Sequence, residues 1–291
     1  MGSNGVVLDD NALRRYGVVR NFPPQDDEEQ DVVTTALSFH QQGEVCVTAR
    51  NDGVISVINC LSGMITKTIL TKRYGVDLVR FTHHPDCILF SSMNDANDHR
   101  IRYHSLFDNK FLRYYAGHSA RVTALMMHPT ADEFMSCSLD GTVRLWDLRG
   151  PDARALIRVG HQPAMSVCGA YDQEGVVFGV YTDDHLIRMY DARNYQDGPF
   201  ANPDGNQLLV ATNRSVFLHL DAFEGHLLHM FTNHEAATPT LFVYRASNGE
   251  HVHTLPRGHQ GPVLDLQWNP QRHLLGSVGG NSTVFWTAGN M

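Results

Sequence analysis

The segment Ser136–Asp147 has the sequence SCSLDGTVRLWD, and the dipeptide Gly117-His118 precedes it. A Gly-His pair near the start and a Trp-Asp pair at the end of a unit of about 40–45 residues are typical of one four-stranded blade of a WD-repeat β-propeller. Asp140-Gly141 supplies turn residues that accept positive φ, as tight hairpins require. The segment therefore predicts two adjacent strands of one blade, joined by a hairpin.

Positions equivalent to Trp146-Asp147 recur along the chain. Each follows a short stretch of alternating, often β-branched residues, and the set is Ile58-Asn59, Tyr103-His104, Trp146-Asp147, Tyr190-Asp191, Leu220-Asp221, Tyr244-Arg245 and Trp286-Thr287. Counted on the second residue, the intervals are 45, 43, 44, 30, 24 and 42 residues. Four of them fit a propeller period of about 40–45 residues. The predicted fold class is therefore all-β, with residues 1–291 forming one domain, a single seven-bladed WD-repeat β-propeller.

Two intervals are too short for complete blades, and the shortfalls fall after Ala201 and near residues 238–240. Either the fifth and sixth blades are truncated, or residues are missing from the chain at these places. A truncated blade exposes sheet edges and core. For this reason the second interpretation is favoured, and we expect missing residues after 201 and near 238–240.

The chain before the first blade is strand-like, because apolar residues recur between Leu13 and Phe22. The last blade ends near Trp286 with no residues left for an outer strand. We therefore predict that residues 12–22 supply the outer strand of the last blade, which closes the propeller by removing the open sheet edge.

Composition excludes several classes of protein. The chain has 291 residues, a net charge of −8 and 42% hydrophobic residues, which argues against a disordered chain and against a general nucleic-acid binder. No apolar run is long enough to span a bilayer, and the N-terminus lacks the pattern of a secretory signal. The five cysteines are scattered and form no Cys-x-x-Cys pair, so we interpret them as reduced, buried thiols.

The residue types in the third blade allow two interpretations. His118, Ser136 or Ser138, and Asp140 resemble a catalytic group on paper, and Trp146 completes the set. The same residues occupy the positions at which WD-repeat blades build a buried hydrogen-bond chain, and buried polar groups need such partners. Since their spacing repeats the blade pattern, we interpret them as a structural network.

Other catalytic or ligand-binding signals are missing from the sequence. It contains no P-loop, no Gly-x-Ser-x-Gly and no Gly-x-Gly-x-x-Gly after a strand, and its 17 histidines lack metal-ligand spacing. We therefore expect a non-enzymatic protein with no catalytic residues, no cofactor and no metal. A propeller of this kind presents loops on its rims to partner proteins.

Basic residues are concentrated in the second and third blades. Nine of the 23 lysines and arginines lie between Lys67 and Arg121. Such a face binds phosphate or an acidic peptide through charge-assisted hydrogen bonds. The other interpretation, which we favour, is an ordinary charged rim.

Several runs of residues resemble one family of WD-repeat proteins. They are YGVDLVR at 74–80, DNKFLRY at 108–114, SLDGTVRLWDLR at 138–149, YDAR at 190–193, DGPFA at 197–201 and DAFEG at 221–225. Together they resemble the WD-repeat subunit shared by the SET-domain histone methyltransferase complex COMPASS and the nuclear protein phosphatase 1 complex of transcription termination. The resemblance covers nearly the whole chain and is most specific in the second to fourth blades.

The resemblance implies a nuclear, non-enzymatic scaffold of chromatin and transcription complexes. Its partners would be a segment of the SET-domain methyltransferase, a segment of the phosphatase 1 targeting subunit, or both. It would also link them to the phosphorylated tail of RNA polymerase II. The resemblance implies a monomer within a hetero-complex, with no membrane and no direct sequence-specific nucleic acid among its partners.

Candidate partner-binding residues lie in the loops that enter the innermost strands. We select Arg73, Tyr74, Asp77, Arg121 and Gln162. Tyr74 offers the large, rigid surface that is typical of interface anchors.

A second hypothesis concerns the residues after the Trp-Asp positions. Trp146–Arg149 and Tyr190–Arg193 match the WDxR pattern of substrate receptors for cullin-4 ubiquitin ligases, to which the sequence is similar in these two places. In that case Arg149 and Arg193 would contact the ligase adaptor. Asp-x-Arg is also frequent in ordinary WD repeats, where it forms local ion pairs. A propeller enzyme is a third, weaker alternative.

Overall fold

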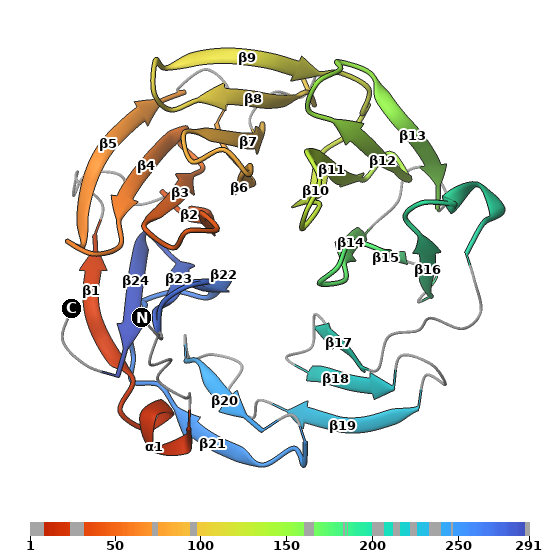
Figure 1. The fold of residues 1–291 in the computed structure, drawn as a ribbon. Coiled ribbons are helices and arrows are strands. Elements are labelled where there is room, and N and C mark those ends of the chain that lie inside the picture. The colour runs from red at the N-terminus through yellow and green to blue at the C-terminus, as the bar shows by residue number, and fades with distance from the viewer. Residues whose placement is uncertain are drawn as a thin grey trace, which may run out of the picture.

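The computed structural model describes residues 9–23, 32–71, 75–93, 98–159, 166–182, 184, 186–199, 207–211, 216–221, 226–232, 240–245 and 247–288. In these residues the regular secondary structure is almost entirely antiparallel strands, which form seven sheets arranged around a ring (Figure 1). The all-β class predicted from the repeat is confirmed. No helix of the described residues is long and apolar enough to cross a membrane.

We number the sheets I to VII in chain order, and in each the strands run from the centre of the ring outward. Sheet I contains β2 (Thr34–Phe39), β3 (Val45–Arg50), β4 (Val54–Asn59) and β5 (Met64–Leu70). Sheet II contains β6 (Val79–Phe81), β7 (Cys87–Ser91), β8 (Ile101–Ser105) and β9 (Lys110–Tyr115). Sheet III contains β10 (Val122–Met127), β11 (Glu133–Ser138), β12 (Thr142–Asp147) and β13 (Ala153–Arg158).

The remaining sheets differ in size. Sheet IV has β14 (Val167–Tyr171), β15 (Val177–Thr182) and β16 (Ile187–Asp191), followed by the 3-10 helix η1 (Tyr195–Asp197). Sheet V has β17 (Gln207–Ala211), β18 (Val216–Asp221) and β19 (Leu227–Thr232), and sheet VI has β20 (Phe242–Tyr244) and β21 (His251–Thr254). Sheet VII joins β22 (Val263–Trp268), β23 (Leu275–Gly279) and β24 (Ser282–Thr287) to β1 (Gly17–Phe22).

The N-terminal strand completes sheet VII. β1 pairs antiparallel with β24, with Val18 opposite Trp286 and Phe22 opposite Thr283. The predicted range, 12–22, is too long at its start: residues Asp10–Leu13 form the short helix α1. Asp9 caps this helix by accepting a hydrogen bond from the Ala12 amide at 2.7 Å, which satisfies one of the free amides of a helix start.

Sheets V and VI are incomplete in the described residues. In the complete sheets the Trp-Asp position ends the third strand from the centre, as Trp146-Asp147 ends β12. By the same criterion β18 is the third strand of sheet V and β20 is the third strand of sheet VI. Among the described residues, sheet V therefore lacks its innermost strand and sheet VI lacks its two innermost strands. The two places where we expect missing residues border or fall within residues 200–206 and 233–239, which lie outside the described residues.

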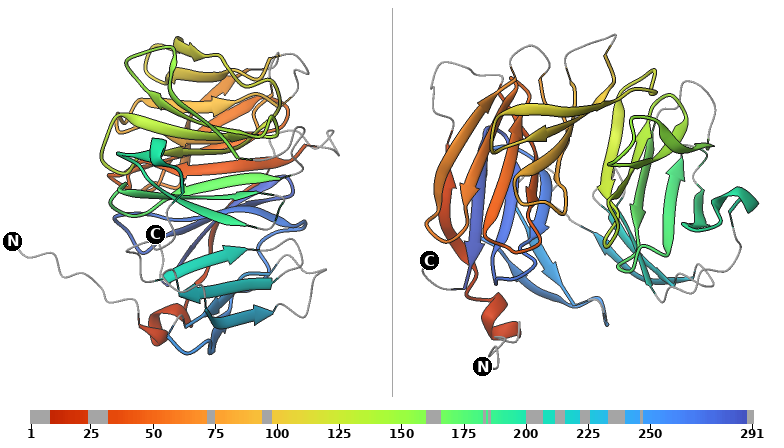
Figure 2. Two further views of the ribbon diagram at one scale, coloured as in Figure 1. Left: turned by 90° about the vertical axis from the view of Figure 1, so that its right-hand side faces the viewer. Right: turned by 45° about the horizontal axis from the view of Figure 1, so that its top comes forward.

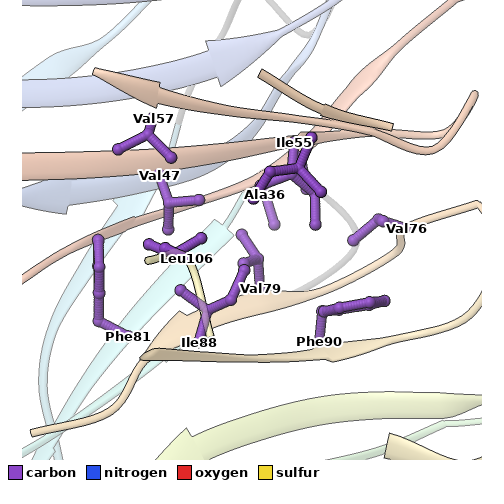
Figure 3. Packing of buried hydrophobic residues seen from close by; sticks show 12 residues of the cluster. Ala36, Val47, Ile55, Val57, Val76, Val79, Phe81, Ile88, Phe90 and Leu106 are labelled. Carbon is purple, nitrogen blue, oxygen red and sulfur yellow. The ribbon is translucent and has the colours of Figure 1, made fainter. Parts of the chain in front are cut away.

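The hydrophobic core is divided among the contacts between neighbouring sheets. Between sheets I and II, a buried cluster includes Val47, Ile55, Val79, Ile88 and Phe90 (Figure 3). Similar clusters join sheet II to III, III to IV, and VII to I. Each large side chain buried in this way contributes about 1.5–3 kcal/mol, so packing between sheets is the main stabilising term.

The strands run across the thickness of the ring, so the turns gather on two faces (Figure 2). We call the face with the first-to-second and third-to-fourth strand turns the lower face. There the Leu148 amide donates to the Asp132 carbonyl at 2.9 Å and ties the two kinds of turn together. The upper face carries the second-to-third strand turns and the connections between sheets.

A recurring hydrogen bond links successive sheets on the lower face. His40 Nε2 lies 3.3 Å from the His83 carbonyl oxygen, and His83 Nε2 lies 3.2 Å from that of Pro129. His128 Nε2 lies 3.0 Å from the Gly175 carbonyl oxygen. The side-chain amide of Asn269 donates from Nδ2 to the Gly43 carbonyl at 2.9 Å. Each side chain thus bonds to the corresponding turn of the next sheet, from VII through I, II and III to IV.

The cysteine prediction needs one correction. All five cysteines are free, and four are buried as expected, but Cys168 is exposed. It alternates along β14 with Val167 and Gly169, which pack toward sheet III, so its side chain lies on the opposite face of the strand.

Candidate protein-binding surface

A buried hydrogen-bond chain connects the residues singled out in the third blade. Trp146 Nε1 donates to Ser136 Oγ at 2.8 Å, and Ser136 Oγ lies 2.7 Å from His118 Nε2. On the other side of the imidazole of His118, Nδ1 lies 2.9 Å from Asp140 Oδ2. Of the two serines offered by the sequence, Ser136 joins the chain. Ser138 donates instead to the Ala120 carbonyl at 3.0 Å.

This chain has one consistent set of donors. Asp140 accepts hydrogen bonds from the Thr142 amide and hydroxyl at 2.9 and 2.6 Å, so its carboxylate is charged and His118 Nδ1 donates to it. Although burial acts to raise the Asp140 pKa, the hydrogen bonds from His118 and Thr142 lower it overall. Burial lowers the pKa of His118 against the opposing effect of Asp140. His118 is therefore neutral and accepts from Ser136.

Sheet VII repeats the arrangement without the carboxylate. Trp286 Nε1 donates to Ser277 Oγ at 2.7 Å, and Ser277 Oγ lies 2.6 Å from His259 Nε2. His259 Nδ1 instead lies 3.2 Å from the Gly279 carbonyl oxygen and 3.1 Å from Ser282 Oγ. Gly280 lies in the turn that corresponds to the one with Asp140, and its φ is +57°. Burial lowers the pKa of His259 as well.

Both networks lie in the core. Ser136 and Ser277 have no exposed surface, and Trp146 and Trp286 are almost completely buried. A serine nucleophile would need access to a substrate, and these hydroxyls are already shared between an indole and an imidazole. The geometry therefore fits the structural interpretation of His118, Ser136, Asp140 and Trp146.

Among the predicted partner-binding residues, Asp77 and Arg121 form an ion pair on the upper face. Arg121 donates from Nε and Nη2 to the two carboxylate oxygens of Asp77, at 2.6 and 2.9 Å. Asp77 is buried, whereas 52% of the Arg121 side chain is exposed. Asp77 of sheet II thus positions the guanidinium of sheet III at the surface. Arg73, Tyr74 and Gln162 lie outside the described residues.

The two arginines of the WDxR hypothesis lie on the lower face, after the third strands of sheets III and IV. In both, the backbone amide donates to Oδ1 of the aspartate two residues earlier at 2.8 Å. The guanidinium groups of Arg149 and Arg193 fold back onto Asp147 and Asp191, respectively, and their side chains are 81% and 74% exposed. The two sites have the same local geometry and present an arginine to solvent.

The described residues contain no cluster of three or more His, Cys, Asp or Glu side chains that could hold a metal ion. They do contain contacts that sequence reasoning missed. The histidines of the lower face hold the sheets together, and a signal for them was present, because His40, His83 and His128 recur at the blade period immediately before their turns. The aromatic residues of β9 were also missed as a surface.

The comparisons with known proteins agree with this architecture. Residues 109–147 and 249–286 match the family of the WD domain, G-beta repeat. The fold and these matches define a WD-repeat protein. The chain is 32% identical over 319 residues to WD repeat-containing protein 82 of Drosophila melanogaster, which covers 97% of each chain.

Two fungal relatives point in the same direction. Set1 complex component swd2 of Schizosaccharomyces pombe is 33% identical over 210 residues, or 66% of this chain and 57% of its own length. COMPASS component SWD2 of Saccharomyces cerevisiae is 31% identical over 235 residues, covering 74% of this chain and 69% of its own. The chain belongs to the family of WD repeat-containing protein 82 and SWD2, which confirms the resemblance to a COMPASS subunit.

Proposed function

We propose that sheets I to VII are the blades of one seven-bladed propeller that spans residues 1–291 and is closed by β1. Pairing of β1 with β24 and the succession of side-chain bonds from sheet VII to sheet IV support this proposal. The alignment with the Drosophila relative is 319 positions long, more than the 291 residues of this chain. That relative therefore contains residues without a counterpart here, as expected if residues are missing from this chain.

On this framework the protein acts as a non-enzymatic scaffold subunit of nuclear chromatin complexes. Its partner is a segment of a SET-domain histone methyltransferase, and a phosphatase 1 targeting subunit is the alternative partner. The observation that carries this proposal is the similarity along 97% of both chains to WD repeat-containing protein 82, together with fungal relatives whose names place them in Set1 and COMPASS complexes. Arg121, held at the upper face by Asp77, is the described residue best placed for contact.

Affinity purification of the full chain from nuclear extract tests this function. We expect a SET-domain methyltransferase or phosphatase 1 to be recovered, and we expect Arg121→Glu to reduce recovery. The control is Arg149→Ala, which removes an exposed arginine from the lower face. Recovery of neither enzyme would contradict the proposal.

The scaffold also links its complex to the phosphorylated tail of RNA polymerase II. The concentration of basic residues between Lys67 and Arg121 supports this part of the proposal, since cationic side chains bind phosphate through charge-assisted hydrogen bonds. Phosphorylated and unphosphorylated tail peptides should differ in affinity for the wild-type chain, and Arg73→Glu or Arg121→Glu should remove the difference. Equal binding of both peptides would refute the link.

The second candidate is a substrate receptor of a cullin-4 ubiquitin ligase. The similar geometry and high exposure of Arg149 and Arg193 favour it. Co-purification of cullin-4 and its adaptor, lost in the double variant Arg149→Ala and Arg193→Ala, would support this function. Retention of a methyltransferase by the same double variant would show that the two surfaces act separately.

A further inference from the structure

The outer strand of sheet II exposes an unusual number of aromatic side chains. Phe107, in the turn before β9, is 82% exposed, and Phe111 and Tyr114 on β9 are 38% and 39% exposed. Leu112 adds a further 49% exposed apolar side chain. Contiguous exposed apolar side chains mark interaction sites more often than isolated ones do.

Two of these rings form one continuous surface with an arginine. The ring centroids of Phe111 and Tyr114 are 5.4 Å apart, and the Arg100 guanidinium carbon lies 5.4 Å from the Tyr114 centroid. A register shift between Tyr103 and His104 pairs Arg113 with Tyr103 and Phe111 with His104, so Leu112 is the extra residue of a bulge. The bulge brings Phe111 and Tyr114, three residues apart, to the same face.

The surroundings of these rings are basic, although the whole chain has a net charge of −8. Lys67 of sheet I reaches across and donates to the carbonyls of Leu106 and Phe107. The Lys110 side chain is 74% exposed. Arg102 is buried and does not contribute to this surface. Lys67, Lys110, Arg100 and Arg113 still outnumber the three nearby carboxylates, Asp86, Asp98 and Asp108. The surface is therefore complementary to an acidic ligand.

The edge of the strand is available for pairing. β9 lies on the outer circumference of the ring (Figure 1) and, among the described strands, pairs with β8 alone. An outer edge presents a row of backbone N–H and C=O groups that an extended peptide satisfies by adding a strand.

We propose that an acidic, extended segment of a partner protein docks along the outer edge of β9. Its apolar side chains lie on Phe107, Phe111 and Tyr114, and its carboxylates meet Lys67 and Lys110. This surface is separate from Arg121 on the upper face. The proposal depends on the scaffold role in one respect: the acidic segment belongs to a protein of the complex that this chain assembles.

The test uses the full-length chain and a synthetic ten-residue peptide in which Glu alternates with Phe or Leu. Binding is measured by fluorescence anisotropy and by hydrogen exchange of the β9 amides. We expect the peptide to protect these amides and to bind more weakly as salt is raised. The double variant Phe107→Ser and Lys110→Glu should lower affinity at least about tenfold, since it removes an apolar contact and reverses a charge.

Sheet I offers a matched control. Leu61 and Met64 occupy the corresponding turn and outer-strand start and are 56% and 60% exposed. The double variant Leu61→Ser and Met64→Ser should leave the affinity unchanged. Because all four residues are exposed, both double variants should fold, and their urea denaturation midpoints verify this.

Several outcomes would overturn the proposal. These are equal loss of binding in both double variants, equal binding of a peptide with Lys in place of Glu, and binding only when the peptide is phosphorylated. Self-association through β9 in place of peptide binding would also overturn it. The Arg121→Glu variant distinguishes the β9 surface from the upper-face site. It should bind the acidic peptide with unchanged affinity even if methyltransferase recovery fails. The Phe107→Ser and Lys110→Glu double variant should lose affinity for the peptide.

Discussion

Asp265 Oδ2 lies 3.2 Å from Arg80 Nη1, although the two residues are 185 positions apart. They belong to the inner strands of sheets VII and II and meet at the inner strand of sheet I. Asp265 accepts from the Leu37 amide at 3.1 Å, and Arg80 donates to the Leu37 carbonyl at 3.0 Å. Side chains of the two neighbours thus satisfy backbone groups on the free edge of β2, which no strand pairs in the described residues.

Replacing Asp265 tests the importance of this three-sheet contact. Asp265→Ala leaves the Leu37 amide without an acceptor and removes the carboxylate that pairs with Arg80, so we expect a loss of about 1–3 kcal/mol in the free energy of unfolding. Asp265→Asn keeps a carbonyl acceptor and should cost less. Urea denaturation measures both, with Asp108→Ala as a surface control that should not change the midpoint. Equal effects of Asn and Ala would show that the acceptor has no role.

The shared serine hydroxyl is the second target. Ser136→Ala leaves the Trp146 indole N–H and His118 Nε2 without partners inside the core, and we expect a loss of about 2–4 kcal/mol, since each buried unsatisfied group costs about 1–3 kcal/mol. Ser277→Ala should have a similar effect in sheet VII. Ser62→Ala, which changes an exposed turn, should have little effect. A Ser136→Ala protein as stable as wild type would contradict the network.

Stability should depend on pH in two ranges. Burial is the main cause that lowers the pKa values of His104, His118 and His259. The unfolded chain therefore takes up protons first as pH falls below about 6.5, so stability should fall over the next pH units. Asp98, whose pKa is lowered to about 2 mainly by its hydrogen bond with Arg100, adds a second decline below about pH 4.

Unfolding free energies measured between pH 8 and pH 3 check this dependence. His259→Gln should reduce the slope of the first range, because one of the three titrating groups is removed. A Glu or Asp variant on the exposed surface should leave that slope unchanged. Constant stability between pH 7.5 and pH 5 would contradict the histidine contribution.

The bond between His128 and Gly175 is open to a double-mutant cycle. Gly175 has φ of +74°, and a Cβ atom there would lie 2.3 Å from the His128 ring. Gly175→Ala should therefore cost more than the roughly 1–2 kcal/mol of the left-handed conformation alone. In the background of His128→Ala the steric clash is absent, so the second substitution should cost less. Additive effects would show that the two residues do not interact.

The sequence predicts the repeat because its signal is local. Trp146-Asp147, Asp140-Gly141 and their counterparts fall within single hairpins, and the third strands end where expected. The pairing of the N-terminal strand was also predicted. Residues 12–22 contain an apolar stretch that precedes the first blade, and the last blade lacked an outer strand with which to cover its edge. The helix α1 was missed because four residues are too few for a helical period, and its signal is a single capping residue, Asp9.

Contacts between repeats are harder to predict. The sequence places Asp77 and Arg121 on one face, but their pairing depends on how far sheet III is rotated relative to sheet II. The bond from His83 to Pro129 joins residues 46 positions apart and becomes visible in the sequence only when the repeats are superimposed. The exposure of Phe111 and Tyr114 depends on a bulge at Leu112, and no residue type at this place in the sequence indicates a bulge.

The pairing of β1 with β24 has a consequence for biosynthesis. Residues 17–22 leave the ribosome before the other described strands, but their only strand partner in the described chain, residues 282–287, is made about 260 residues later. At a synthesis rate of about 5–20 residues per second, this delay is roughly 13–50 seconds. Throughout this interval an apolar strand with a free edge waits in solution while sheets I to III form behind it. This strand therefore needs protection, and chaperone binding should be concentrated on residues 17–22 until residues 282–287 have been made.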